Sequence, residues 1–292
     1  MPDEHLPVYQ IQDFHAQEQK ESYFYLRSFA AHLREHQFIQ RPHKHNFYIL
    51  LFISKGHGTH TIDFEAYPVQ ANTMFFLAPG QVHSWQLSDD TDGYIIFFTS
   101  AYFRLEFPHQ KLNRFPFFHA PYHKPLLLLH PSDGEAILEV IRPMQREHEA
   151  QKPMAEDVIR DYLDILLILL RRRYQEQNPS GQIPAPLLSQ LQALEQLIDK
   201  HYREHQPVRF YADKLHVTAK QLNDTCRRSI NKTVNELIQE RVLLEARRLL
   251  VHSHLTVSEV AARLGYFDNA YFFRFFKKHT GQTPEQFRNA QH

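Results

Sequence analysis

The sequence predicts an α+β protein of two domains, and three observations lead to this prediction. Residues 45–103 hold short runs rich in Phe, Ile, Tyr and Thr, separated by turn residues. The last third of the chain instead holds short amphipathic helical patterns. Between them, 178–186 (NPSGQIPAP) concentrates Pro, Gly, Ser and Asn, which disfavour helix and strand alike. We therefore expect a sheet domain at 1–177, a linker at 178–186 and an all-α domain at 187–292.

Length and composition agree with two domains and bound the class of protein. The 292 residues suffice for two separate cores. No apolar run reaches membrane-spanning length, and the N-terminus MPDEHLPVYQ is acidic and polar, unlike a signal peptide. The one cysteine, Cys226, excludes an intramolecular disulfide and fits a reducing compartment. These features predict a cytoplasmic protein.

The first domain is expected to begin with antiparallel strands. The expected strands are 47–54, 59–64, 73–77, 83–87 and 94–99. Turn signals separate them at 55–58, 79–80 and 89–93. Many short strands at regular spacing predict a barrel or a sandwich. Two helical stretches, 132–150 and 155–173, trail behind them.

The helix at 155–173 carries apolar residues over more of its surface than one core contact needs. One face is expected to lie on the barrel, which leaves a second face for a partner helix. We therefore expect a homodimer through 155–173, with burial inside one chain as the alternative. Arg171, Arg172 and Arg173 follow this helix, and cations at a helix C-terminus are favourable without any ligand.

The second domain contains the same kind of unit twice. Around 212–226 and again around 260–276, a short amphipathic helix meets a tight turn and a second short helix follows. This arrangement is the helix-turn-helix unit, whose second helix can enter the DNA major groove. One continuous helix at 233–250 joins the two units. Residues 187–292 hold 16 Lys and Arg against 11 Asp and Glu, a net charge of +5, whereas 1–186 carry −5.

Helix starts in the second domain carry capping signals. In a capping box a Thr side chain accepts from the third amide of the helix while a Glu or Gln reaches back. Asp268 is expected to cap the remaining recognition helix, and Gly265 to supply a left-handed stop. The four expected boxes are Thr218 with Gln221, Thr233 with Glu236, Thr256 with Glu259, and Thr283 with Gln286.

The second unit resembles the signature of AraC/XylS transcriptional regulators over some 30 positions. The first unit fits more loosely, with Cys226 where a large aromatic residue is usual in the family. The likeness covers about 187–292 and implies a double helix-turn-helix domain that binds DNA. The matching residues of the second unit are Val260, Ala261, Leu264, Gly265, Tyr266, Asp268, Tyr271, Phe272, Arg274, Phe276, Lys277, Lys278, Gly281, Thr283, Pro284, Phe287 and Arg288; those of the first are Ala212, Leu215, Val217, Leu222 and Arg227.

The first domain resembles the small cupin barrel that many AraC-type regulators carry as a ligand sensor. His43-x-His45 with Gly56 matches one cupin motif, and the run from Pro79 to His83 resembles the other. Metal-binding cupins place Glu four or five residues after the second His, where this chain has Ile49 and Leu50. We therefore expect no metal, no cofactor and no catalytic residue. Strand alternation sends His43, His45, Phe47 and Ile49 to one face. The expected ligand-binding residues are these four together with His83 and Trp85.

Alternatives stand beside this interpretation. His43, His45 and His83 could form a three-nitrogen site of the kind that zinc or iron accepts, which would make the chain a metal-dependent cupin enzyme with an accessory helical domain. The favoured alternative to a metal is that these histidines hydrogen-bond a ligand, a water molecule or the barrel rim. Trp85 could equally be a packed core residue. The remaining histidines, such as His36, His109 and His123, are expected on the surface.

Helical spacing assigns roles to the outward residues of the two recognition helices. Lys220 and Asn223 are expected to read bases, because Lys suits guanine and Asn suits adenine. Phe273 is expected either to contact thymine methyl groups or to pack on its own domain. Phosphate contacts are expected from Thr218, Gln221 and Arg227. The second helix is expected to turn Phe272, Phe275 and Phe276 inward, and Asn269, Ala270, Phe273, Arg274 and Lys277 outward.

Together these patterns predict a sequence-specific DNA-binding transcriptional regulator controlled by a small molecule in the barrel. Two recognition helices on one protomer would read major-groove segments about 34 Å apart. The expected partners are double-stranded DNA, a small-molecule effector and a second copy of the chain, with RNA polymerase as a further candidate. The alternatives are the metal-dependent enzyme and a helical domain that binds protein. The eight glycines count against a dinucleotide fold.

Overall fold

The computed structural model describes residues 6–14, 23–36, 39, 41–106, 112, 115–118, 124–178 and 185–290. The chain divides into two compact units, Pro7–Ser180 and Gly181–His292 with Met1–Leu6, which are described separately below. No helix within the described residues is long and apolar enough to cross a membrane. Residues His109 and His123 lie outside the described residues.

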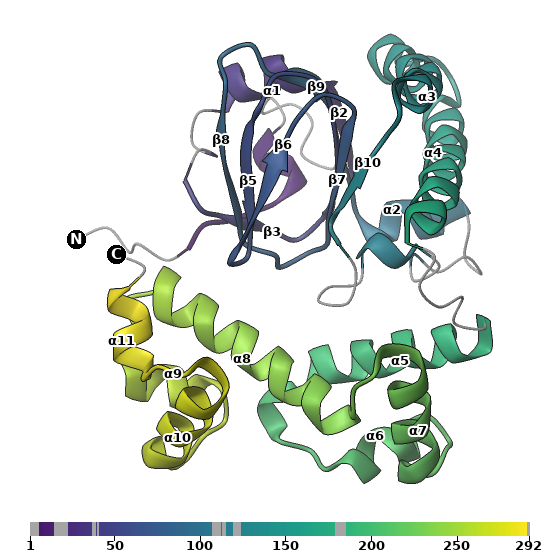
Figure 1. Ribbon diagram of the computed structural model, residues 1–292. Helices are drawn as coiled ribbons and strands as arrows, with labels where there is room; N and C mark the ends of the chain where they lie inside the picture. The colour runs from purple at the N-terminus through teal and green to yellow at the C-terminus, as the bar shows by residue number, and fades with distance from the viewer. Residues whose placement is uncertain are drawn as a thin grey trace. The chain divides into compact units, whose positions relative to one another are not determined.

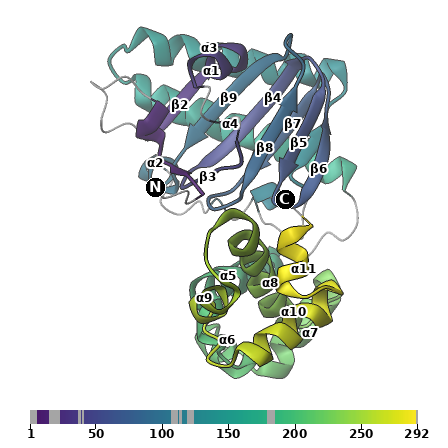
Figure 2. The same cartoon turned by 90° about the vertical axis from the view of Figure 1, so that its left-hand side faces the viewer.

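The N-terminal unit is built on two antiparallel sheets that form a cupin-like barrel (Figure 1). The five-stranded sheet has the order β10-β7-β4-β9-β2 and the three-stranded sheet the order β6-β5-β8, while β1 and β3 form a parallel pair. Figure 2 shows the strands of both sheets side by side. The strands are β1 Val8–Tyr9, β2 Phe24–Ser28, β3 Lys44–His45, β4 Tyr48–Lys55, β5 Gly58–Ile62, β6 Glu65–Val69, β7 Thr73–Leu77, β8 His83–Leu87, β9 Asp92–Phe98 and β10 Leu126–Leu128.

Most of the expected strands are present, and the additional ones have a physical reason. The strands expected at 73–77 and 83–87 are confirmed with the same bounds. The strand β6 was not expected because it contains Pro68 and exposed polar residues, yet it lies at the edge of its sheet, where proline is tolerated. The short strands β2 and β10 pair with β9 and β7, partners distant in sequence.

The position of strand β4 between two cores explains why its sequence is apolar without interruption. Its residues alternate between two cores, so both faces of the strand are buried. Ile49 and Leu51 point into the core between the two sheets, with Trp85 from the facing sheet. Leu50 and Phe52 point the other way, into a core that the helices behind the five-stranded sheet complete.

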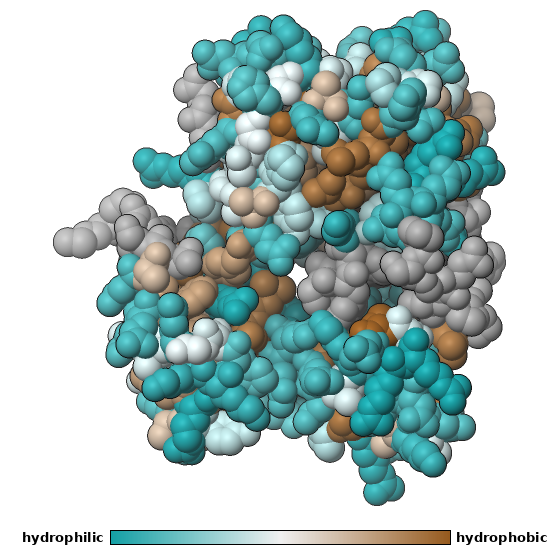
Figure 3. Space-filling view, viewed as in Figure 1, coloured by the Kyte–Doolittle hydropathy of each residue, from teal (hydrophilic) through white to brown (hydrophobic). Residues whose placement is uncertain are grey.

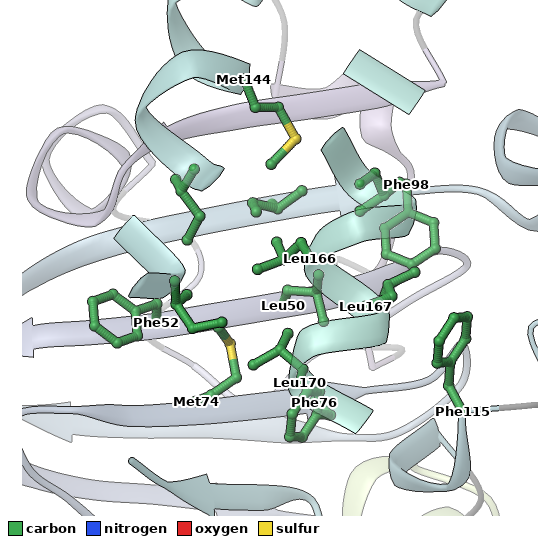
Figure 4. Close-up of a cluster of buried hydrophobic side chains, with 14 of the residues drawn as sticks. Leu50, Phe52, Met74, Phe76, Phe98, Phe115, Met144, Leu166, Leu167 and Leu170 are labelled. Carbon is green, nitrogen blue, oxygen red and sulfur yellow. The ribbon is translucent and has the colours of Figure 1, made fainter. Parts of the chain in front are cut away.

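Two long helices cover the outer face of the five-stranded sheet. They are α3 Pro131–Ala150 and α4 Ala155–Gln177, close to the helices expected from sequence. They pack against each other, and Figure 4 shows Leu166, Leu167 and Leu170 of α4 beside Leu50 and Phe76 of the sheet. Shorter elements complete the unit: the 3-10 helices Ile11–Phe14 and Pro116–Phe118, α1 Phe29–Glu35 and α2 Ser100–Glu106.

The C-terminal unit is entirely helical, as expected. The long helix α8 contacts helices of both helix-turn-helix units, and it begins at the expected cap, Thr233 (Figure 1). The helices are α5 Ala185–His201, the 3-10 turn Tyr202–Glu204, α6 Val208–Lys214, α7 Ala219–Ile230, α8 Val234–His252, α9 Val257–Arg263, α10 Asn269–Thr280 and α11 Pro284–Asn289.

All four expected capping boxes are present in the structure. In each, the Thr hydroxyl accepts from the backbone amide three residues on, and the Gln or Glu side chain accepts from the Thr amide. Asp268 caps α10 by accepting from the amide of Ala270 at 2.8 Å. Gly265 has φ +83°, the left-handed conformation expected of a sharp stop after α9. These caps set where both recognition helices begin.

Candidate ligand-binding and DNA-binding sites

The barrel interior gathers the three expected histidines and the tryptophan. The ring centroids of His43 and His83 are 4.3 Å apart, those of His45 and His83 are 5.0 Å apart, and that of Trp85 is 4.9 Å from His83. All four side chains are buried. His43 reaches this place through an isolated bridge to His83, so two short segments far apart in sequence present their rings together.

The remaining expected residues line the same region. Phe47 stacks on His45 with ring centroids 4.7 Å apart, and it also packs against Phe97. Ile49 lies in the same core between the sheets as Phe47 and Trp85. The structure therefore places all six expected residues in one interior, with the aromatic and aliphatic side chains forming an apolar wall beside the imidazoles.

Sequence reasoning missed a fourth imidazole in this cluster. His60 on β5 is fully buried, opposite Trp85 in the ladder, and its Nε2 lies 3.0 Å from Nδ1 of His83. The expectation that the remaining histidines are on the surface is therefore wrong for His60. Alternation with Ile62, two residues on, was the available signal, because both face inward along the strand.

A second buried histidine, His32 on α1, was missed for a different reason. Its Nδ1 lies 2.9 Å from the hydroxyl of Tyr25, and its ring stacks on Phe14. His36 is only partly buried and lies 3.4 Å from the same hydroxyl. The helix α1 is too short for a periodic pattern to reveal which of its faces is buried. The surface expectation is thus wrong for His32 as well.

Backbone carbonyls fix the protonation of two of the imidazoles. Nδ1 of His43 donates to the carbonyl oxygen of Arg41, and Nδ1 of His45 donates to that of Phe47, each at 2.9 Å. A carbonyl can only accept, so the hydrogen of each neutral ring lies on Nδ1 and Nε2 presents a lone pair. Within the described part of the chain, Nε2 of His45, Nε2 of His83 and the indole Nε1 of Trp85 have no hydrogen-bond partner.

Burial keeps these rings neutral near pH 7. The pKa of His45 and that of His60 are lowered to about 3, chiefly by desolvation; for His60, the neighbouring His43 and His45 contribute to the same shift. The pKa values of His43 and His83 are also lowered, chiefly by burial. The interior thus offers two fixed acceptors and one indole donor, together with the His60–His83 pair, whose shared hydrogen can lie on either ring. Such a set suits a neutral polar group, whereas a carboxylate would meet lone pairs.

The structure does not arrange these residues as a metal centre. Among the residues that the structure describes, no group of three or more His, Cys, Asp or Glu side chains is placed to hold a metal ion. Nδ1 of His83 is engaged with His60, and Ile49 stands where a cupin carboxylate would reach the site.

In the first helix-turn-helix unit, two of the expected DNA contacts are exposed cations. Lys220 and Arg227 of α7 are exposed, and Arg227 lies at 4.0 Å from the carboxylate of Asp224. Thr218 and Gln221 are committed to the capping box, where the Gln221 side chain accepts from the Thr218 amide at 2.9 Å. Their expected phosphate contacts would have to coexist with that bond.

Asn223 does not fit its expected role as a base reader. Its side-chain Nδ2 donates to the carbonyl oxygen of Ala219 at 3.0 Å, and its Oδ1 accepts from the backbone amide of Val234 at 3.1 Å. The side chain thus satisfies the first amide of α8 and ties α7 to it. Helical spacing alone placed Asn223 outward, but it could not show that the next helix begins beside it.

In the second unit, some outward residues of α10 contact other side chains of the domain, and others are exposed without such a contact among the described residues. Asn269 is exposed but donates to Ser258 Oγ at 2.9 Å, which ties it to α9. Ala270, Arg274 and Lys277 are exposed, and the two cations form no ion pair with any residue the structure describes. Phe273 is only half exposed and has its ring edge-on to Phe272.

The inward residues of α10 follow the expected pattern with one difference. Phe272 and Phe276 are fully buried, as expected. Phe275 was expected to point inward as well, but it is only half-buried, where it packs against Tyr266 and His279. An arc of aromatic side chains therefore supports α10 from its N-terminal turn to its last turn.

A unit with two capped recognition helices on one connecting helix, joined to a barrel with a polar, buried interior, defines a DNA-binding protein with a separate ligand-binding domain. Two family models match the chain accordingly: an AraC-like ligand binding domain over residues 23–163 and a helix-turn-helix domain over residues 211–290. The chain belongs to the AraC/XylS family of transcriptional regulators.

Known relatives agree with this assignment. The chain is similar to the HTH-type transcriptional activator RhaR of Cronobacter sakazakii, at 24% identity over 248 residues, 84% of this chain and 86% of the relative. The RhaR of Enterobacter sp. strain 638 is 25% identical over 252 residues, 85% of this chain and 86% of the relative. The comparisons give no support to the alternative of a metal-dependent enzyme.

Solved structures also match, with low overall superposition. Wild-type ToxT from Vibrio cholerae, bound to an unsaturated fatty acid, is 16% identical, covers 83% of this chain and 87% of its own, and superposes with a TM-score of 0.41. The C-terminal domain of AraT, a response regulator from Geobacillus stearothermophilus, is 24% identical, covers 38% of this chain and 88% of its own, and has a TM-score of 0.34.

Proposed function

We propose that this chain activates transcription from specific promoters and that a small molecule bound in the barrel controls its DNA occupancy. The observation that carries the proposal is that one chain holds both two capped recognition helices and a buried barrel interior, in which described ring nitrogen atoms have no hydrogen-bond partner. The relatives named above are transcriptional activators, which favours activation over repression.

The barrel interior favours an effector that is small and partly apolar. Fixed acceptors on His43 and His45 and the indole donor of Trp85 call for one or two neutral polar groups on the effector. Phe47 and Ile49 would meet its apolar part. No residue in this set is proposed to be catalytic.

The C-terminal unit would read two segments of the major groove on one face of the duplex. Helix α8 joins the two recognition helices α7 and α10, so their separation is set by packing rather than by a flexible linker. Segments about one DNA turn, roughly 34 Å, apart are the expected target. Lys220 and Arg274 are the proposed base readers, and Arg227 and Lys277 the proposed phosphate contacts.

We also propose that α4 mediates a homodimer. Part of the second apolar face expected on this helix is used by α3 of the same chain. Val158 and Ile165 nevertheless remain 37% and 46% exposed on α4. Figure 3 shows a further apolar area over β10, where Leu128 is exposed. These residues would supply the apolar centre of an interface between two copies.

Two further expectations follow from regulation at promoters. The protein would work in the compartment that holds the chromosome, the cytoplasm of a bacterial cell, and RNA polymerase is the proposed partner of the DNA-bound form. Mapping bound sites genome-wide together with transcript levels, in cells with and without the chain, tests both. Bound sites without any change in nearby transcripts would contradict activation.

Two experiments in vitro test the proposal directly. In a gel shift, the full chain should bind a DNA selected from random sequence, and that DNA but not bulk DNA should compete. Trp85 is the only tryptophan, so its fluorescence reports on the proposed ligand site during titration with candidate small molecules. A His45→Phe variant should abolish the fluorescence response to any molecule that binds there. Binding that bulk DNA competes equally would contradict sequence-specific regulation.

A further inference from the structure

The two helix-turn-helix units of this chain can be compared with each other residue by residue. In the first, the amide of Val217 donates to the carbonyl oxygen of Ala212 at 3.1 Å; in the second, the amide of Tyr266 donates to that of Ala261 at 2.9 Å. The stop residues also match, because His216 has φ +55° and Gly265 φ +83°. The first helices and their stops are therefore equivalent at an offset of 49 residues.

The recognition helices are equivalent at a different offset. Their N-caps are Thr218 and Asp268, 50 residues apart. Four residues into each helix, Leu222 and Phe272 are both fully buried. The second turn therefore contains one residue more than the first. That residue is Phe267, which stands between Tyr266 and the cap Asp268.

The side chain of the inserted phenylalanine is not buried in the protein interior. Phe267 is fully exposed, with a relative exposure of 105%. A residue directly before an N-cap commonly packs against the fourth helical residue as a hydrophobic staple, yet Phe272 at that place is buried under Tyr266 instead. Stability of the folded unit therefore does not explain an aromatic residue at this position.

The surroundings of Phe267 favour one partner. Between positions 260 and 281 the chain has four cations, all of them exposed, and one acid, Asp268, whose carboxylate caps the helix. This balance of charge suits the phosphate backbone of DNA. The N-terminal end of a recognition helix is also the part that contacts base edges in the major groove.

We propose that Phe267 is a specificity-determining DNA contact, whose ring lies against a thymine methyl group where α10 enters the major groove. An apolar side chain can distinguish thymine there because the methyl group is the one apolar feature of the base edges. The proposal rests on the proposed DNA-binding function and deepens it. It assigns to Phe267 the thymine contact that sequence spacing had suggested for Phe273, whose ring is partly covered by Phe272.

The test uses the full chain and a DNA site selected from random sequence by the wild type. Affinity is measured for the wild type, Phe267→Ser and the control Tyr23→Ser, which removes an exposed aromatic ring from the other unit. Phe267→Ser should weaken the selected site about 5- to 20-fold and leave bulk DNA unaffected within about twofold. Tyr23→Ser should change neither value. Equal thermal unfolding of all three proteins excludes misfolding.

A second measurement identifies the contacted atom. Each thymine of the selected site is replaced in turn by deoxyuridine, which lacks the methyl group. One replacement should weaken the wild type several-fold and have no effect on Phe267→Ser. Unchanged affinity and preference in Phe267→Ser, or a methyl effect that persists in it, would overturn the proposal. So would normal DNA binding with lost promoter activation, which would assign the ring to a protein partner. If the wild type itself selects no sequence, the proposed function fails as well.

Discussion

The imidazoles of His60 and His83 are joined at 3.0 Å between Nε2 and Nδ1, and both rings lie at the centre of the barrel. One ring comes from β5 and the other from β8, so the bond links neighbouring strands of the three-stranded sheet through their side chains. Because one nitrogen must accept and the other donate, the pair is intact only while at least one ring is neutral.

Acid should therefore destabilise the protein well above the pH at which carboxylates titrate. The folded-state pKa of His45 and of His60 is lowered to about 3, so between pH 6.5 and pH 3 the unfolded chain binds protons that the folded chain does not. Each ring should lower the free energy of unfolding by up to about 1.4 kcal/mol per pH unit as pH falls through this window. Urea unfolding followed by Trp85 fluorescence at pH 7.5, 6.5 and 5.5 measures the loss.

A matched pair of variants attributes this loss to the buried rings. His60→Gln retains a polar side chain but removes one buried titrating group, so its unfolding free energy should depend less steeply on pH. His57→Gln removes an exposed histidine three residues earlier and should keep the wild-type slope. Equal slopes for the two variants, or a protein as stable at pH 5.5 as at 7.5, would show that the cluster is not neutral in the folded state.

Two neighbouring residues of α4 separate dimerisation from folding. Ile165 is 46% exposed, whereas Leu166 is fully buried against the five-stranded sheet (Figure 4). Ile165→Asp should leave the thermal transition intact and shift the protein from dimer to monomer in sedimentation, because an unpaired charge would be buried only in the interface. Leu166→Asp should unfold the unit by placing that charge in the core.

The exposed end of the same helix offers a control for this experiment. Glu176→Ala changes an exposed residue whose ion pair with Arg173 is at the surface, so neither mass nor stability should change appreciably. A dimer that persists in Ile165→Asp would rule out α4 as the interface. Loss of folding in the same variant would mean that the exposed face supports the monomer instead.

Asn223 should behave as a structural residue. Asn223→Ala removes the acceptor of the Val234 amide at the start of α8, and we expect it to lower the free energy of unfolding by about 1–2 kcal/mol. Base preference should be unchanged in the folded fraction. Asn223→Asp keeps the acceptor and should recover most of the stability. A selective loss of preference at one base pair, without loss of stability, would restore the role expected from spacing.

Asn223 and His60 show where sequence reasoning stopped in this chain. Local patterns sufficed to predict the capped helices, because both partners of a capping box, a Thr and a Glu three residues apart, are visible in the sequence. The role of Asn223 depends on where α8 begins in space, eleven residues later, which periodicity cannot supply. His60 lay within an expected strand, but its environment depends on the pairing of β5 with β8.

The same limit applied to the sheet and to the ligand site. The continuous apolar run of β4 predicted a strand but not that Leu50 and Ile49 serve different cores, which follows from the helices α3 and α4 on the far side. The edge strand β6 was hidden by Pro68, whose tolerance depends on its place in the sheet. The histidines of the two motifs were predicted to lie together because the chain resembles the cupin barrel, and spacing alone did not imply it.

Within α10, we expect Arg274 to read a base and Lys277 to contact the phosphate backbone. Both are exposed and unpaired among the described residues, but Arg274 lies nearer the N-terminal end of the helix, the end that meets base edges. Arg274→Ala should cost about 1–3 kcal/mol of binding free energy and relax preference at one base position. Lys277→Ala should weaken all sequences alike and lower the slope of log affinity against log salt by about one.

Titrations of both variants against a selected site and its scrambled counterpart, over a salt series, decide between these roles. Lys278→Ala, one residue further along, gives the comparison for loss of a cation alone. If Arg274→Ala weakens the selected and the scrambled DNA equally, this helix holds the backbone and does not read bases. Helix α7 would then be the element that reads the sequence, because Lys220 is exposed there and does not form the hydrogen bonds within the domain that engage Asn223.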